Sequence, residues 1–109
     1  MNNDQLAMLN ITNYKISSYF TRSSCNGGGV VILTHKNITC KQLMLPEVQS
    51  MLAEKEFECC LSEIVIGRMS IVLVCMYRTP KHCYLEQFFY KFEFCHQLIT
   101  KFILIKENQ

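Results

Sequence analysis

Three glutamates are the residues of this chain whose spacing most suggests chemistry at a metal ion. Glu54, Glu56 and Glu58 occupy alternate positions, and carboxylate oxygens are the ligands that hard cations such as Mg²⁺ take. Glu56 and Glu58 would share one face of a strand. A solvated entrance to a strand is the commoner explanation of such a cluster, so both interpretations stay open.

A glycine run offers a second candidate, because its backbone N–H groups can donate to a phosphate. However, Gly27-Gly28-Gly29 precedes the β-branched run Val30-Val31-Ile32 rather than a helix, and no Lys-Ser or Lys-Thr pair follows it. Nucleotide-binding loops have both of these features. A turn between two strands is therefore the favoured interpretation.

The seven cysteines and three histidines do not form a recognisable metal or nucleophile motif. The cysteine count is odd and the spacing contains no C-x-x-C pair. His82 adjoins Cys83 and Cys95 adjoins His96, but neighbouring side chains usually diverge, which does not suit the tetrahedral geometry of zinc. We expect free thiols that pack as small apolar side chains, and no metal site.

Composition places the chain among globular proteins. Half of its 109 residues are apolar and 18% are charged, so a single small domain with a thin core is expected. The net charge of +2 comes from scattered Lys and Arg residues, which alone gives no case for nucleic acid. No apolar stretch approaches the length of a bilayer span. The first residues also lack the basic segment followed by a long apolar segment that is typical of a secretory signal peptide. We expect no membrane partner and an intracellular location, cytoplasmic or nuclear.

The N-terminal half predicts short elements around turns. Leu6–Leu9 suggests a helical turn, and Tyr14–Phe20 and Val30–Ile32 suggest strands on either side of the glycine-rich segment. Between Lys41 and Glu56, Pro46 is a breaker. After it, Val48, Met51 and Leu52 have the spacing of one side of a short helix.

The clearest local pattern is a hairpin. Phe57–Ile66 and Met69–Tyr77 are strand-like runs joined at Gly67-Arg68, where glycine supplies the positive φ of a type II′ turn. Both runs carry apolar residues on more than one face, which is typical of inner strands covered by other layers. Arg78-Thr79-Pro80-Lys81 should end the second strand, because Pro80 cannot donate to a ladder.

Beyond the hairpin the period changes from that of a strand to that of a helix. From Leu85 to Thr100 apolar residues recur at intervals of three and four, which predicts an amphipathic helix. The apolar run Phe102-Ile103-Leu104-Ile105 then predicts a short strand. Strand, crossover helix and strand would make a βαβ unit.

The order of these pieces resembles the endonuclease domain of non-LTR (LINE-type) retrotransposon reverse transcriptases, a branch of the endonuclease/exonuclease/phosphatase superfamily. The residues that carry the resemblance span nearly the whole chain: Tyr14, Arg22, Gly27–Ile32, Phe57-Glu58, Glu63-Ile64, Val74–Pro80, Phe88–Leu98 and Phe102–Ile105. In that family a Gly-Gly-Gly-Val segment begins a strand. A Tyr-Arg-x-Pro segment closes the strand before a long helix, and the next strand runs into Gly-Asp-Phe-Asn.

The resemblance implies a magnesium-dependent phosphodiesterase that acts on DNA. Tyr77 matches the family tyrosine whose hydroxyl lies beside the scissile phosphate, and is the one catalytic residue that carries over. Arg78 and Arg22 would contact the substrate backbone, although a solvated arginine or an aromatic residue at a strand end explains these positions without a function. The resemblance assigns no metal ligand to this chain.

Three departures from the family pattern predict an inactive copy. The Glu-x-Trp-like segment that carries the family's metal-binding glutamate would precede the Tyr14 strand and is not found, and Lys106-Glu107-Asn108-Gln109 stands where Gly-Asp-Phe-Asn is expected. The family's later Ser-Asp-His region is also not found in this sequence. Glu107 and Gln109 are longer by a methylene than the Asp and Asn they would replace, a displacement that costs on the order of a hundredfold in rate. We expect these 109 residues to bind no Mg²⁺ and to bind nucleic acid weakly or not at all.

These expectations combine into one fold hypothesis. Residues 1–109 form a single partial domain of the DNase I-like, four-layer α/β sandwich, with a mixed sheet and one long amphipathic helix. An incomplete sandwich would leave strand edges and an apolar sheet face in water, which favours self-association. The alternative is a small non-catalytic module that retains the strand–helix core and contacts protein, or nucleic acid through Arg22, Arg78 and Lys81.

Overall fold

A computed structural model describes residues 3–23, 28–78 and 85–107. In chain order its elements are α1 (Asn3–Met8), β1 (Tyr14–Phe20), β2 (Val30–His35), β3 (Thr39–Gln42), α2 (Pro46–Gln49), β4 (Phe57–Ile66), β5 (Met69–Arg78) and α3 (Leu85–Glu107). The chain is therefore an α/β protein, as expected. The predicted end of β5 at Pro80, the Lys81 contact and the middle of the glycine-rich turn lie outside the described residues.

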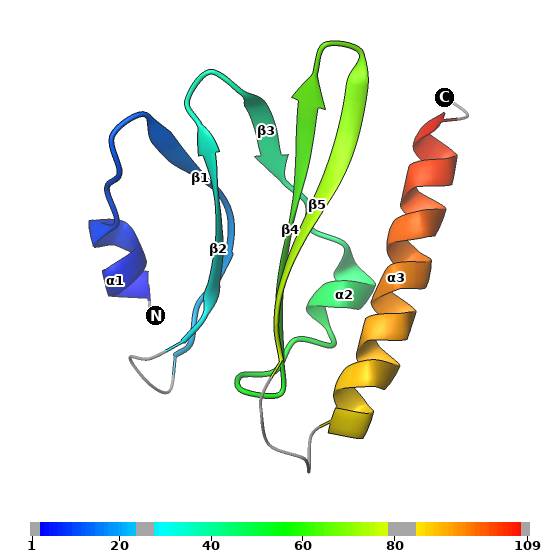
Figure 1. Ribbon diagram of the computed structural model, residues 1–109. Helices are drawn as coiled ribbons and strands as arrows, with labels where there is room; N and C mark the ends of the chain where they lie inside the picture. Colours follow the sequence, from blue (N-terminus) through cyan, green and yellow to red (C-terminus); the bar gives the residue numbers. More distant parts are fainter. Residues whose placement is uncertain (1–2, 24–27, 79–84, 108–109) are drawn as a thin grey trace.

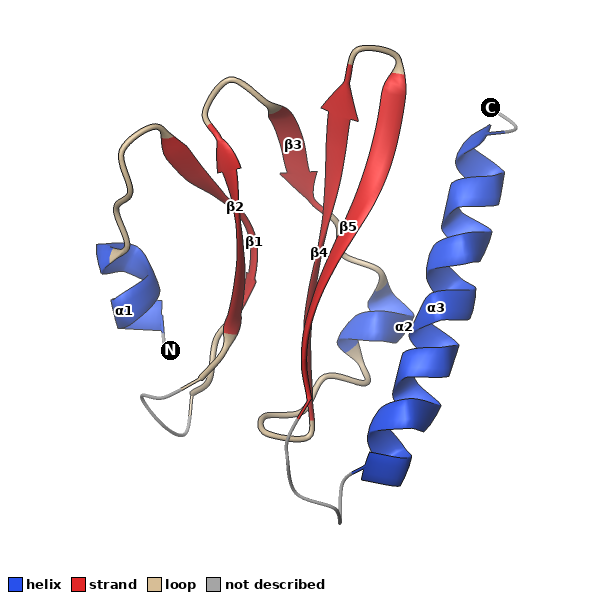
Figure 2. Cartoon of the chain, in the orientation of Figure 1, coloured by secondary structure: helices blue, strands red, loops and turns tan. Residues whose placement is uncertain are grey.

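The strands form two sheets that pack against each other. One is the pair β1–β2, and the other has the order β3-β4-β5. The helices α2 and α3 lie on the side of the three-stranded sheet that faces away from β1–β2, and α1 lies beyond β1–β2 (Figure 1). Figure 2 shows the same order of layers by secondary structure.

The expected mixed sheet is wrong. Each strand pair in the described part of the chain is antiparallel. The reason is the connections: β4 and β5 are joined by two residues, and α3 does not lead into a further strand within the described range. A parallel pair needs a crossover of about a dozen residues that returns to the same sheet.

Strand β4 is buried on both faces from Phe57 to Glu63, whereas Val65 and Ile66 at its end are exposed. Its odd-numbered residues Phe57, Cys59 and Leu61 join the larger core with Phe88 and Cys95 of α3. Its even-numbered residues face the other sheet, where Cys60 packs with Val30 and Ile32 of β2. The period of two along a strand thus gives each face of β4 a different partner.

The predicted hairpin is confirmed. The register runs without interruption from Phe57↔Arg78 to Ile66↔Met69. Gly67 has φ of 60°, and Arg68 is not among the described residues of positive φ. A single positive φ at the first turn residue is the type II′ pattern. The strands at Tyr14–Phe20 and at Val30 are confirmed as well, and so are the helices near Leu6 and Val48.

The predicted strand Phe102–Ile105 is wrong, because α3 continues without a break to Glu107. Leu98, Ile99 and Phe102 keep the helical spacing and pack on the larger core. Neither Gly nor Pro follows Thr100 to stop the helix. A short apolar run has no period of its own, so the packing of Phe102 on the larger core selects helix over strand.

Cover over the three-stranded sheet is uneven, which corrects the expectation that both strands of the hairpin lie inside. The odd-numbered residues of β5 are on the same face as Cys75, the face turned toward β1–β2. Three of them, Met69, Ile71 and Leu73, are not covered by that sheet and are exposed. On the other face, Lys91 of α3 donates to the carbonyl of Met51 at 2.8 Å and ties α3 to the α2 segment. The side chains of β4 are therefore mostly covered, whereas several apolar side chains of β5 are exposed to solvent.

Shortening a core side chain on β4 tests this arrangement. Leu61→Ala removes a fully buried side chain, and we expect the free energy of unfolding to fall by about 2–5 kcal/mol in urea denaturation. Leu104→Ala is the matched control on an exposed position of α3, where a change within about 0.5 kcal/mol is expected. Equal losses in the two variants would contradict the placement of β4.

Candidate functional site

An arginine, a glutamate and a tyrosine from three elements meet at one end of the β4–β5 hairpin. Glu58 and Tyr77 are direct partners across the two strands. Arg22 follows β1 and reaches over from the other sheet. Its Nε lies 2.5 Å from Oε2 of Glu58, and its Cζ lies 5.5 Å from the centre of the Tyr77 ring.

The arginine–glutamate pair is withdrawn from water. The Glu58 side chain is 0% exposed and that of Arg22 is 9% exposed. Glu58 Oε2 also accepts a hydrogen bond from the backbone N–H of Lys55 at 2.8 Å. Lys55 has φ of 67°, a left-handed conformation that costs a non-glycine residue about 1–2 kcal/mol. A buried carboxylate needs such donors, because its charge is otherwise poorly solvated.

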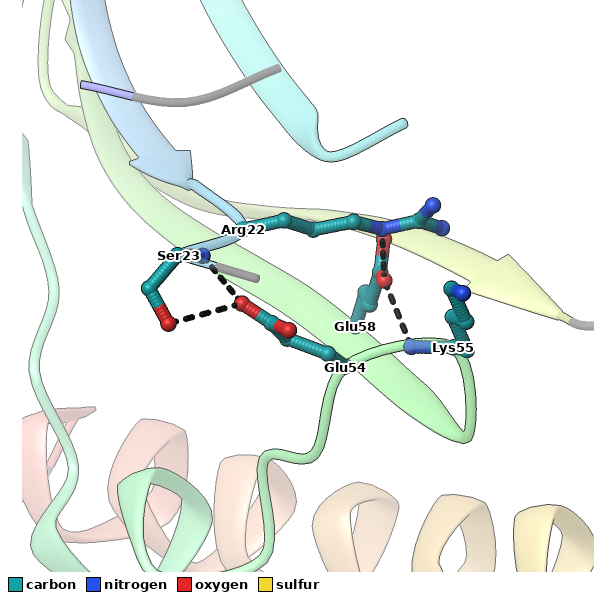
Figure 3. A network of polar contacts seen from close by, with 5 residues as sticks. All are labelled: Arg22, Ser23, Glu54, Lys55 and Glu58. Atoms are coloured by element: carbon teal, nitrogen blue, oxygen red, sulfur yellow. Dashed lines mark hydrogen bonds and ion pairs between the residues drawn. The ribbon is translucent and has the colours of Figure 1, made fainter. Parts of the chain in front are cut away.

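Two neighbours of Arg22 in the structure, Glu54 and Gly28, hold the chain around it. Figure 3 shows the contact of Glu54 with Ser23. Glu54 Oε1 accepts hydrogen bonds from the backbone N–H and the hydroxyl of Ser23. Gly28 has φ of 82°, and a Cβ at this position would collide with the Arg22 guanidinium. This glycine of the predicted turn is thus required by its close approach to Arg22, and only glycine adopts its φ without strain.

The structure brings together two of the three residues that the sequence marked as functional. Arg22 lies against Tyr77, which is 39% exposed at the end of β5. Arg78 is also exposed, but it pairs with Phe57 and so shares the face of the sheet that α3 covers. Since successive side chains of a strand point to opposite faces, Tyr77 and Arg78 cannot line one surface together.

Glu58 is the residue that sequence reasoning misjudged. The sequence allows a metal ligand or a solvated strand entrance at this position, whereas Glu58 is fully buried and paired with Arg22. Glu56 precedes β4 and its Oε1 lies 3.3 Å from Nζ of Lys91. The acid within the apolar run from Phe57 to Leu61 was a signal, because a carboxylate at a buried position requires a cation nearby. Its partner lies 36 residues away in the chain, and spacing could not identify it.

Magnesium does not fit at Glu58. Its Oε1 is buried and has no hydrogen-bond partner among the described residues, which at first suggests a ligand. A guanidinium already occupies the other oxygen, and Mg²⁺ keeps several waters that a fully buried side chain leaves no room for. In the described residues no group of three His, Cys, Asp or Glu side chains is arranged to hold a metal ion.

Hydroxyls and thiols line the contact between the two sheets. Ser17 of β1 and Ser62 of β4 share a hydrogen bond between their hydroxyls. Burial and the neighbouring Cys75 thiol raise the pKa of Cys60 to about 12. Burial also acts to raise the pKa of Cys40, but hydrogen bonds with Ser17 and Thr34 and the charge of Lys15 together lower it below its usual value. The free thiols therefore differ in reactivity.

Comparisons with known protein families, with curated proteins and with solved structures find no match for this chain. No helix of the described segments is long and apolar enough to cross a membrane.

Neutralising one member of the buried pair tests its energetics. Glu58→Gln leaves the Arg22 guanidinium buried without its counterion, and we expect a loss of about 3–5 kcal/mol in unfolding free energy. The double variant Arg22→Met, Glu58→Gln has no buried charge, so it should lose less than the two single variants summed. Glu56→Gln, at a pair with Lys91 whose side chains are 24% and 20% exposed, leaves no charge fully buried and should cost less, on the order of 1 kcal/mol. Strict additivity of the single variants would refute the coupling.

Alkylation rates test the pKa values of the thiols. The thiolate is the reactive form, and at pH 8 a thiol of pKa about 12 is ionised to roughly one part in ten thousand. Iodoacetamide at pH 8 should therefore label Cys40 well before Cys60, as read by peptide mass spectrometry. Because Cys60 is also buried, it should stay largely unlabelled at pH 8 for as long as the chain is folded. The same chain unfolded in guanidinium is the control, in which both thiols should react alike.

Proposed function

We propose that this chain is a partial copy of the magnesium-dependent DNA endonuclease of non-LTR retrotransposons, one that keeps the scaffold of the substrate-facing tyrosine without the cleavage step. The observation that carries the proposal is the placement of Tyr77 at the end of β5, half-exposed and backed by Arg22. The resemblance assigns the phosphate-side hydroxyl to this same tyrosine.

The buried pair gives Tyr77 a defined position. Glu58 holds the Arg22 guanidinium at 2.5 Å, and the guanidinium in turn lies within cation–π distance of the ring at 5.5 Å. A ring held on one side by a fixed cation has fewer orientations available. Such preorganisation suits a hydroxyl that must meet a phosphate oxygen. In this proposal Arg22 acts as a positioning residue for Tyr77, because its charge is already offset by Glu58.

The course of α3 supports the absence of cleavage. The resemblance would put the family's Asp–Asn pair at Glu107 and Gln109, after a strand. In the structure, the 23-residue helix α3 extends to Glu107 instead. At 1.5 Å per residue α3 is about 34 Å long. It begins near the Tyr77 end of the hairpin and runs back toward the Gly67 turn (Figure 1). The end of α3 is thus remote from Tyr77, so the last residues of this helix do not lie beside that tyrosine.

A second candidate is the non-catalytic interaction module. It is favoured by the exposed apolar side chains that gather on β5 and α3, among them Leu73 and Phe89. Exposed apolar patches mark contact surfaces in many soluble proteins. The exposed Arg78 would provide the nucleic-acid contact in a module of this kind.

Plasmid nicking combined with DNA binding separates these functions. With Mg²⁺ and high protein concentration we expect no nicking by the wild-type chain, and none by Tyr77→Phe. Magnesium-dependent nicking that disappears in Tyr77→Phe would overturn the proposal. A known active endonuclease of the same class serves as the positive control for the substrate.

Fluorescence anisotropy with labelled duplex DNA gives the second measurement. A partial copy with little affinity should show a weak signal that changes little between Arg78→Ala and the control Lys36→Ala. Affinity that falls steeply with rising salt would instead support the interaction module, because contacts with phosphates release counterions from the DNA. In that case Arg78→Ala should bind more weakly and depend less steeply on salt, because it makes one phosphate contact fewer.

A further inference from the structure

Strand β5 has a free edge that can accept another strand. In the described part of the chain it pairs with β4 alone. Its register with β4 contains no bulge, and residues Met69–Tyr77 include no charge and no proline. Charges, prolines and bulges are the features by which soluble proteins block their sheet edges. The edge of β5 has none of them before Arg78.

The surfaces on both sides of this edge are apolar. On one face of β5, Ile71 and Leu73 are exposed. On the other, α3 presents a row of residues toward the edge, here called the α3 stripe: Phe89, Phe92, His96, Ile99 and Ile103. Phe92, His96 and Ile99 line an open hollow with Val74 and Met76 of β5, which fixes the side of the helix on which the stripe lies.

We propose that two copies of this chain associate through the edge of β5, as a continuous antiparallel sheet across a two-fold axis. A two-fold axis perpendicular to the sheet places both α3 helices on the same side of it. The α3 stripe of one copy then faces that of the other. One symmetric contact therefore covers the strand edge and the helix row together, as an isologous interface requires.

The backbone selects the register of this pairing. Because Met69 pairs with Ile66 across the two-residue turn, the odd-numbered residues of β5 direct their N–H and C=O groups at β4. The even-numbered residues direct theirs at the free edge. With Val74 opposite Val74 of the second copy, all of residues 70–78 find partners. The axis then passes near the middle of α3, and Phe89 comes close to Ile103 of the second copy.

Charge complementarity favours this register and this occupant. It sets Arg78 of the second copy opposite Ser70, on the face that α3 covers. The Ser70 hydroxyl donates to Glu63 Oε2 at 3.2 Å. Glu63 already pairs with Lys41, whose Nζ lies 3.5 Å from its Oε1. Glu63 and Ser70 line an open hollow of about 450 Å³ with Val72 and Phe102, where the guanidinium of Arg78 would add a second cation beside this carboxylate. Shifting the register by two residues toward the turn would instead set Arg78 opposite Arg68, an unfavourable pair of like charges.

The contact must bury enough area for a stable dimer. Phe89 and Phe92 are 52% and 43% exposed in a single copy. At roughly 150–250 Å² for a whole aromatic side chain, the four rings of two copies would bury roughly 300–500 Å². The paired strands and the side chains beside them must supply the remainder of the roughly 1,000 Å² at which stable protein contacts begin.

Analytical ultracentrifugation of the full chain across a range of concentrations tests the association. The wild-type chain should reach a dimer and go no further. Phe89→Glu and Leu73→Lys should each raise the dimer dissociation constant by at least about tenfold, since symmetry applies each charge twice. Tyr90→Glu is the matched control, because Tyr90 is the next residue of α3, is 75% exposed and lies off the stripe.

A charge exchange tests the register. Arg78→Glu alone should weaken the dimer by about tenfold, because it sets a glutamate near Glu63 of the second copy. Ser70→Lys alone should weaken it too, because the lysine meets Arg78. The double variant should restore the wild-type affinity. Circular dichroism of each variant shows whether the fold is kept, and Lys36→Glu controls for net charge.

A chain that stays monomeric at high concentration while folded would overturn the proposal. Open-ended aggregation, or a dimer that the exchange variant does not restore, would overturn it as well. The association is independent of the function proposed above, since none of these measurements involves DNA.

Discussion

Burial of β4 on both faces is the constraint on which the rest of the structure depends. A strand in the middle of two layers must present side chains that suit a different partner on each side. Here the odd positions Phe57, Cys59 and Leu61 are apolar and meet the helices, whereas the buried even positions include Glu58 and Ser62. Those polar groups must find partners inside the protein, because an unsatisfied buried group is expensive. The two sheets are consequently joined by polar pairs as well as by apolar contact.

The pair of Arg22 and Glu58 connects this constraint to the candidate site. A buried ion pair adds little net stability compared with apolar residues of similar volume, because both charges lose their water. What it supplies is geometry: it brings the end of β1, the turn at Lys55 and the ring of Tyr77 to one place. The exposed Arg78, although next to Tyr77 in the chain, lies on the opposite face.

The same architecture explains why one flank is sealed and the other is open. On the β4 side, α2 and Lys91 close the contact with α3. On the β5 side the two-stranded sheet does not cover Leu73, which is exposed. The α3 residues Phe89 and Phe92 are exposed as well. A folded chain with an uncovered strand edge beside an uncovered apolar helix face gains free energy by covering both. Such a flank is where a second copy of the chain would pack.

Local patterns in the sequence determined much of the fold. The strand from Tyr14 to Phe20, the hairpin with its turn at Gly67 and the start of α3 at Leu85 were all predictable, because each depends on a period or a turn residue read over a few positions. Tertiary structure alone decided the rest. Phe102–Ile105 became helix because Phe102 packs on a core built by distant residues. Glu58 became a buried ion-pair partner because Arg22, far away in the chain, folds back over it. Short-range periodicity specifies elements, whereas the burial of a charge depends on which elements meet, and that information is spread over the whole chain.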